Sequence, residues 1–262
     1  TNAILTGYSL IKSGLCNTIL IIGADDESTS GSKLEWDLSR GNFAFPVHWA
    51  ALFAKKHMRQ FGTSEEQIAL IASRNRSNAI KNPSALFRKK ITLDDVMDSK
   101  MIVEPIKLLE CSYVCTGASA LIITSEENAK KFTDLPVWIS GIGSFTSTAS
   151  FGNLSKNLSS IVSTQLASKM AYTSSKFTPK DIDVVELHDA FSIMELLAYE
   201  DLNLTTKGTG GNYAEHTEKI INPRGGLLGS GHPLGATGVA QTAEVFNQIV
   251  GTVGRRQARS CN

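Results

Sequence analysis

Apolar residues follow two different spacings along this chain of 262 residues. Four short apolar runs have the length and the β-branched content of buried strands. These runs are residues 18–24, 118–125, 137–143 and 182–187. Between them, apolar residues three or four positions apart predict amphipathic helices. The predicted helices occupy residues 1–14, 47–61, 64–80, 161–173, 192–202 and 239–250, and residues 92–99 form a short capped helix.

The alternation of strands and helices predicts an α/β fold with a largely parallel sheet. A polar stretch at 126–136 forms the natural boundary between two halves. We therefore expect an N-terminal half over residues 1–133, which includes a loop region at about 30–105, and a C-terminal half over residues 134–262.

Composition narrows the class of protein. The net charge is +1, without basic runs, so the chain has no electrostatic footprint for nucleic acid. No apolar run approaches the roughly 20 residues that a membrane span needs. Four cysteines without a regular framework favour a reducing compartment. The chain begins at Thr1 rather than at a methionine, and we expect a fragment or a processed chain.

The segment "NPRGGLLGSGHPLGATG", residues 222–238, places six glycines and two prolines around His232. Glycine lets the main chain pass close to a ligand, and the helix predicted next offers free N–H groups that favour negative charge. A dinucleotide-binding loop would need a glycine at Leu234, and a P-loop would need a lysine at His232. The remaining alternative is a structural turn with an incidental histidine.

His188, in "VVELHDAFS", follows an apolar strand, where α/β sheets carry ligand-binding residues. Its imidazole can donate a hydrogen bond, position a water or act as acid or base. Alternatively, Asp189 is a helix N-cap and His188 a satisfied buried residue. Cys111 and Cys115 have a C-x3-C spacing that is not a zinc knuckle, so we expect small buried thiols and no metal site.

Two motifs near the end of the chain resemble those of the thiolase superfamily. They are H-D-A-F in "VVELHDAFSIMELLAYEDL" and G-H-P-L-G-A-T-G in "INPRGGLLGSGHPLGATGVAQTAEVFNQIVG", in the expected order and spacing. The segment "SRNRSNAIKNPSALFRKKITLDDVMDSKMIVEPIKLLECS" resembles the loop region and its return strand in that family. The resemblance covers nearly all of the chain and is strongest to the branch of sterol-carrier-protein-type thiolases and their archaeal and bacterial relatives.

The resemblance implies a thiolase fold of two similar βαβαβαββ halves with layered helices and parallel-rich sheets, incomplete here at both termini. It implies an acyltransferase, usually a homodimer, that acts on acyl-CoA by 3-ketoacyl-CoA thiolysis or by an acetoacetyl-CoA-type Claisen condensation. His232 would deprotonate the nucleophilic cysteine and bind the thioester oxygen, and His188 would hold a catalytic water or an oxyanion donor. Gly226, Gly231 and Gly235 would let the coenzyme A thioester approach. Coenzyme A is substrate here, and no covalent cofactor is expected.

The sequence also departs from the family pattern. The nucleophilic cysteine of the family would lie just upstream of Thr1, and the ending "ARSCN" does not resemble the glycine-rich continuation of family members. Position 190 is alanine, where the carrier-protein enzymes have a second thiol and the archaeal-like members have alanine. We therefore expect the chain as given to be inactive by itself.

Two other functions compete with acyl transfer. One is a thiolase-like retro-aldolase on steroid-type CoA esters, which works with a small partner protein that has an OB-fold and often a zinc ribbon. The intact G-H-P histidine argues against it. The other is a non-catalytic chain that binds coenzyme A or lipid, or a truncated product. A cytoplasmic location is expected, or a peroxisomal one if the source is eukaryotic.

Overall fold

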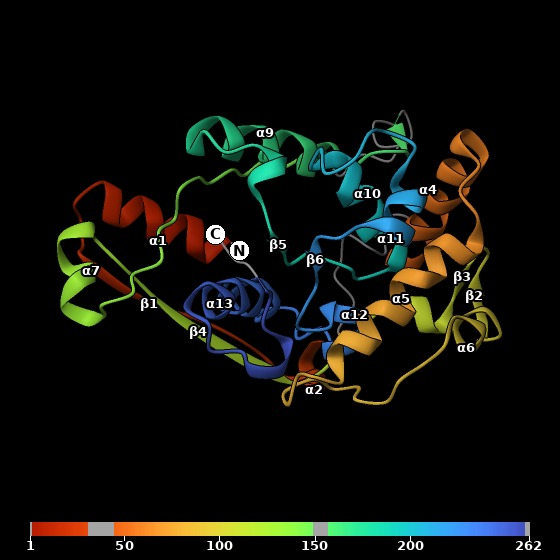
Figure 1. Ribbon diagram of the computed structural model, residues 1–262, viewed down its shortest axis with the longest axis horizontal. Coiled ribbons are helices and arrows are strands. Elements are labelled where there is room, and N and C mark those ends of the chain that lie inside the picture. Colours follow the sequence, from red (N-terminus) through yellow and green to blue (C-terminus); the bar gives the residue numbers. More distant parts are fainter. Residues whose placement is uncertain (1, 31–44, 149–156, 260–262) are drawn as a thin grey trace.

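The computed structural model describes residues 2–30, 45–148 and 157–259 (Figure 1). Its α-helices are α1 (Asn2–Lys12), α2 (Glu27–Ser30), α4 (Pro46–Phe61), α5 (Glu65–Ala79), α6 (Leu93–Met97), α7 (Glu126–Phe132), α9 (Val162–Ser175), α10 (Ser192–Asp201), α11 (Gly210–His216), α12 (Gly226–Ser230) and α13 (Thr237–Val250). Its strands are β1 (Thr18–Asp25), β2 (Met101–Val103), β3 (Ile106–Lys107), β4 (Gly117–Thr124), β5 (Val184–Val185) and β6 (Ile220–Ile221). Short 3-10 helices are η2 (Leu108–Glu110), η4 (Pro179–Asp181) and η5 (Gly254–Arg256).

Local chemistry sets the ends of several helices where the sequence predicts them. Helix α4 ends at Gly62, which has the left-handed φ of 75° that a glycine adopts without steric cost. Helix α5 begins with a capping box, in which the Ser64 hydroxyl accepts from the backbone N–H of Gln67 and the Gln67 side chain accepts from the backbone of Ser64. Thr92 and Asp95 form the same arrangement at the start of α6, so the predicted short capped helix is confirmed.

The longest strands, β1 and β4, pair antiparallel from Thr18 opposite Thr124 to Asp25 opposite Gly117. Helices α1 and α13 lie on the same side of this pair (Figure 1), where Ile4, Ile21 and Val239 form a small buried cluster. On the opposite side, Leu20, Ile22 and Ile122 are exposed to solvent. Side chains of successive strand residues point to opposite faces, which explains why one set is covered and the other is not.

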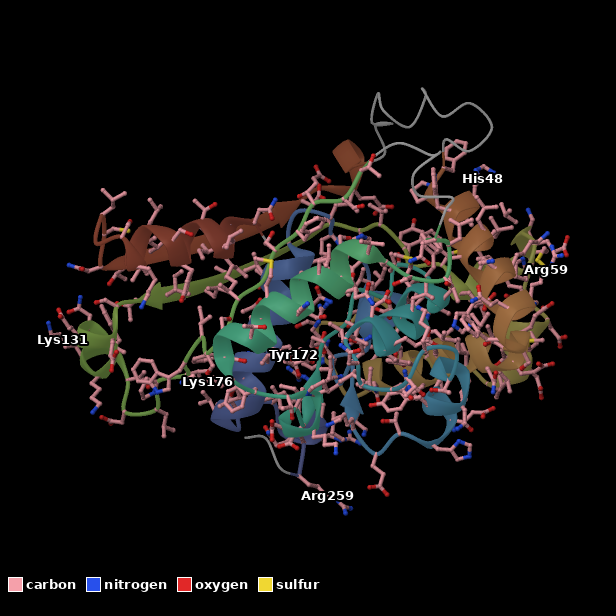
Figure 2. All side chains as sticks on the ribbon, turned by 90° about the horizontal axis from the view of Figure 1, so that it is seen from above. His48, Arg59, Lys131, Tyr172, Lys176 and Arg259 are labelled. Atoms are coloured by element: carbon pink, nitrogen blue, oxygen red, sulfur yellow. The ribbon has the colours of Figure 1, made fainter. Side chains whose placement is uncertain are left out.

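The main core lies at the other end of the molecule, among α4, α5, α6, α10 and α11. Its largest fully buried side chains include Ile68, Ile71, Leu196, Leu197 and Tyr199. Lys131 on α7 and Arg59 on α4 mark the two ends of the molecule (Figure 2). Within the described ranges, no helix is both long and apolar enough to cross a membrane.

Two details of the predicted sheet are wrong. Among the described strands only β5 and β6 pair in parallel, whereas β1–β4 and β2–β3 are antiparallel. The apolar run at 137–143 is not a strand. Gly141 and Gly143 in this run pack against the backbone of α9 at Ala171 and Ala167 so closely that a Cβ would clash. The run therefore uses its glycines to contact a helix instead of pairing with a strand.

The division of the chain at 133/134 stays a prediction. Residues 31–44 of the predicted loop region lie outside the described residues, and the predicted strand at 182–187 is reduced to Val184–Val185.

Candidate active site

The structure brings the two predicted histidines together. The imidazole centroids of His188 and His232 are 5.0 Å apart, and the rings meet edge to face at 81°. His188 lies between β5 and α10, and His232 lies between α12 and α13, five residues before Thr237. The two loops come from positions 44 residues apart in the sequence. The juxtaposition favours a joint chemical role over an incidental histidine in a turn.

A third segment, which leads into β4, connects these two loops. Cys111 forms an antiparallel bridge with Phe191, and Val114 forms a parallel bridge with His232. The His232 N–H donates to the Tyr113 carbonyl at 2.8 Å. Its two cysteines predict buried thiols, and the residue types carry no signal for its main-chain role.

Thr237 sets the tautomer of His232. The Thr237 hydroxyl donates to the Pro233 carbonyl at 2.9 Å, and the same oxygen lies 2.7 Å from Nδ1 of His232. Because the hydroxyl proton is already used, Nδ1 is the donor in the second bond, and Nε2 carries the lone pair. The Nε2 atom of His232 can thus accept a proton. The sequence did not lead to Thr237 as a residue of the site. A hydroxyl side chain just before the predicted helix at 239–250 was the feature that could have indicated it.

Burial favours the neutral form of the His232 imidazole. Desolvation, followed by the charge of His188, lowers the pKa of His232 from 6.5 to about 4. Desolvation by the surrounding protein also lowers the pKa of His188, although this residue is exposed to solvent. An imidazole that stays uncharged can accept a proton from a nucleophile or donate its N–H to a developing oxyanion.

The three glycines predicted to admit the substrate contact other parts of the chain. A Cβ on Gly226 would lie 2.1 Å from Oδ2 of Asp189, and one on Gly231 would lie 2.6 Å from Sγ of Cys115. Gly235 lies against the carbonyl of Ala24. These positions need glycine for internal packing, and their contribution to coenzyme A binding stays a prediction.

Cys111 and Cys115 do not have the environment of a nucleophile. Cys16, Cys111 and Cys115 are free thiols. Burial raises the pKa of Cys111 to about 12, and burial also raises the pKa of Cys115. A reactive cysteine needs a lowered pKa, whereas the surroundings of these two thiols raise it. Cys261 lies outside the described residues. No cluster of metal-ligating side chains occurs in the described part of the chain.

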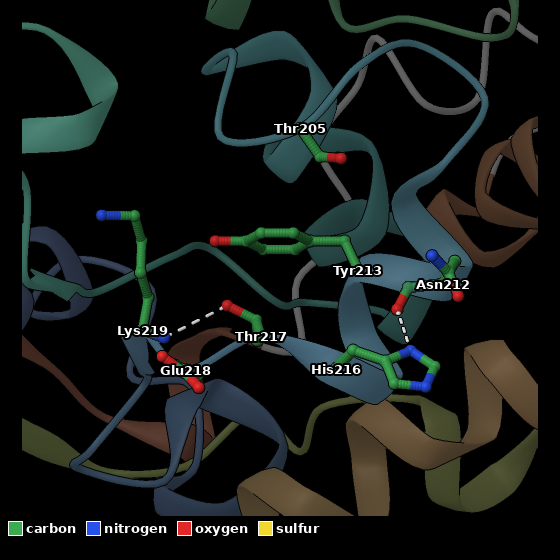
Figure 3. A pocket seen from close by; sticks show the side chains of 7 residues that line it. All are labelled: Thr205, Asn212, Tyr213, His216, Thr217, Glu218 and Lys219. Carbon is green, nitrogen blue, oxygen red and sulfur yellow. Dashed lines mark hydrogen bonds between the residues drawn. The ribbon is translucent and has the colours of Figure 1, made fainter.

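A separate pocket of about 360 Å³ lies beside α11 and β6 (Figure 3). Two hydrogen bonds join residues of its lining: Nδ1 of His216 contacts the Asn212 carbonyl at 2.9 Å, and the Lys219 N–H donates to the Thr217 hydroxyl at 3.2 Å. Neither the histidine pair nor the glycine-rich loop lines this pocket.

Comparison with known proteins agrees with the motifs. Residues 143–262 match the family model described as thiolase C-terminal domain-like. The chain is 37% identical to an acetyl-CoA acetyltransferase of Methanothermobacter thermautotrophicus over 97% of its own length and 68% of that protein. It is 34% identical to sterol carrier protein 2 of Oryctolagus cuniculus over 98% of its length, but spans about half of that protein, 52%.

Among solved structures, the chain is similar to one described as the Ltp2-ChsH2(DUF35) aldolase. The TM-score is 0.84 and the sequence identity 25%, over 97% of this chain and 70% of that one.

Proposed function

This chain belongs to the thiolase family, and from that premise we propose that it serves acyl transfer on acyl-CoA thioesters, with His232 as general base. The observation that carries the proposal is the 5.0 Å pairing of His188 with a His232 whose Nε2 is free to accept a proton. The similarity to an archaeal acetyl-CoA acetyltransferase supports the same chemistry.

In the proposed first step, Nε2 of His232 takes the proton of the nucleophilic cysteine, which the resemblance places just upstream of Thr1. The thiolate attacks the carbonyl carbon of the acyl group, and an S–C bond forms. In thiolysis the C–C bond to the acetyl-CoA unit then breaks, and the proton held by His232 neutralises the leaving carbanion. A second coenzyme A thiol then removes the acyl group from the cysteine.

His188 has the complementary role in this proposal. Its neutral ring can donate an N–H to the carbonyl oxygen as negative charge develops there, directly or through a water. The 81° angle between the rings lets the two imidazoles act on different atoms of one substrate.

The test uses the protein expressed from its complete gene, assayed for thiolysis of acetoacetyl-CoA. His232→Asn should lower kcat on the order of a hundredfold or more, because the general base is lost. His216→Asn is the matched control, since the His216 side chain on α11 is 73% exposed and lies outside the site. A His232→Asn enzyme with a near-native kcat contradicts the proposed role.

A second candidate function is retro-aldol cleavage of a β-hydroxyacyl-CoA, with a small partner protein that has an OB-fold and often a zinc ribbon. The observation that favours it is the TM-score of 0.84 to a structure described as an aldolase with two named components. This reaction releases a ketone or aldehyde without added coenzyme A and without an acyl-enzyme. A protein that turns over neither substrate fits the binding alternative. The cytoplasmic or peroxisomal location stays a prediction.

A further inference from the structure

Asp189, which directly follows His188, is fully buried and accepts hydrogen bonds from a helix start 38 residues later. Its carboxylate accepts the backbone N–H of Leu227 at 2.7 Å and that of Leu228 at 3.2 Å. These N–H groups belong to the first turn of α12, whose N-cap residue Gly225 supplies no side-chain cap. The carboxylate therefore caps α12 from a distant part of the sequence.

Helix α12 ends at Ser230, two residues before His232. One carboxylate thus joins the loop of His188 to the short helix that leads into His232. The Asp189 carboxylate packs tightly against Gly226. This residue has a φ of 57°, and a Cβ there would overlap Oδ2 of Asp189. Small displacements of the carboxylate are therefore passed on to α12.

A second hydrogen bond holds the residue before His188. The Leu187 N–H donates to Oδ1 of Asn222 at 2.7 Å, and Asn222 lies just before the glycine-rich turn. The residues on both sides of His188 are therefore hydrogen-bonded to the segment 222–228, which precedes His232.

A buried amide orients the Asp189 carboxylate. Nδ2 of Asn75 on α5 donates to Oδ2 of Asp189 at 2.8 Å and to Oε2 of Glu195 at 2.6 Å. Asn75, Asp189 and Glu195 are all fully buried. Glu195 in turn accepts from the side chain of Asn222 at 2.6 Å. The hydrogen bonds of Asp189 and of Asn222 therefore belong to one network.

We propose that the Asp189 carboxylate, oriented by Asn75, is the positioning residue that fixes the distance between His188 and His232. The chemical meaning of this pairing rests on the proposed acyl transfer, whereas the pairing itself can be measured without turnover. A misplacement of about 1 Å between catalytic groups costs on the order of a hundredfold in rate, so a device that fixes the distance matters to the reaction.

The experiment is NMR on the full chain carrying isotope-labelled histidine, read through the cross-peak between the ring protons of His188 and His232. His188→Gln and His232→Gln assign the two rings. In Asp189→Asn, one carboxylate oxygen becomes an NH2 group that cannot accept from the backbone or from Asn75, and we expect the cross-peak to be lost. The free energy of unfolding of each variant is measured alongside.

Asp201→Asn is the matched control. Asp201 is also buried and its carboxylate accepts the backbone N–H of Ile161 at 2.6 Å, at the start of α9, away from both histidine loops. We expect this variant to be destabilised like Asp189→Asn and to keep the cross-peak. A retained cross-peak in Asp189→Asn, or an equal loss in Asp201→Asn, overturns the proposal.

Should Asp189→Asn fail to fold, Asn75→Ala carries the same test. It leaves the carboxylate in place and removes the donor that orients it, and we expect a weakened cross-peak. An unchanged cross-peak overturns the proposal.

Turnover separates this proposal from the proposed function. If neither the protein expressed from its complete gene nor its variants transfer an acyl group, and the cross-peak is lost in Asp189→Asn alone, the positioning role stands and the acyl-transfer function is contradicted.

Discussion

His232 acquires its chemical state from its neighbours. Thr237 fixes the proton on Nδ1, and burial with the nearby His188 lowers the pKa of the ring to about 4. Arg224 lowers this pKa further, and Asp25 raises it. The same imidazole on an exposed loop would be partly protonated near neutral pH.

The tautomer gives a prediction at Thr237. Thr237→Val removes the acceptor for Nδ1–H while keeping the shape of the side chain, so the proton should redistribute between the two ring nitrogens. The ¹⁵N chemical shifts of His232 measure this directly. Thr237→Ser, which restores the hydroxyl, should keep the native shifts. Native shifts in Thr237→Val would show that the hydroxyl does not set the tautomer.

The lowered pKa of His232 makes stability depend on pH. Between pH 6.5 and about 4 the unfolded chain binds a proton at this ring and the folded chain does not, so the free energy of unfolding falls as the pH is lowered through this window. Across this window the loss of stability at this ring amounts to about 3 kcal/mol. Urea unfolding of His232→Gln should show a smaller decrease between pH 6.5 and 4.5, by about 2 kcal/mol. The exposed control His216→Gln should follow the wild type, and parallel curves for His232→Gln and wild type would contradict the assignment.

Helix α12 is a five-residue element stabilised from outside itself. It has no side-chain N-cap of its own, and the Asp189 carboxylate accepts from its first N–H groups. Such a short helix is unstable alone. Its position beside His232 is therefore a property of its contacts.

Gly226→Ala tests how closely this element is fitted. The residue has a φ of 57°, and the added Cβ would lie 2.1 Å from Oδ2 of Asp189. Strain and overlap together should cost on the order of 3 kcal/mol in the free energy of unfolding. Gly251→Ala is the matched control, with a φ of 80° and no neighbour within 4 Å of the added Cβ, and should cost about 1 kcal/mol. Equal costs from denaturant unfolding would show that the carboxylate moves aside freely.

At the scale of the whole molecule, one face of the β1–β4 pair exposes apolar side chains. Leu20, Ile22 and Ile122 are 58%, 62% and 63% exposed, and Leu20 lies opposite Ile122 across the ladder. Adjacent exposed apolar side chains on a two-stranded sheet favour association with another apolar surface. The homodimer expected from the sequence is one way to cover it.

Charged residues on this face should lower self-association. We expect Leu20→Lys combined with Ile122→Glu to shift the sedimentation profile toward the monomer at a given concentration, because a charged pair cannot be buried without cost. Met170→Lys on α9, where the side chain is 49% exposed, is the control for adding charge elsewhere. An unchanged profile in the double variant, or an equal shift in the control, would show that another surface drives association.

The sequence by itself determined the elements whose signals are local. The capping boxes at Ser64 and Thr92 and the glycine after α4 act within four residues, so the helix starts and the end of α4 could be predicted. The runs at 18–24 and 118–125 became β1 and β4 because their apolar β-branched residues fit a half-buried ladder. The motifs also pointed to both histidines.

Tertiary structure decided what depends on residues far apart in the chain. The run at 137–143 packs against α9 instead of pairing with a described strand. Asp189 caps α12 rather than α10, the helix that follows it in the sequence. The pKa of His232 and its tautomer follow from burial and from Thr237. Residue types state which bonds a side chain can form, but burial and partner identity arise only when distant segments pack.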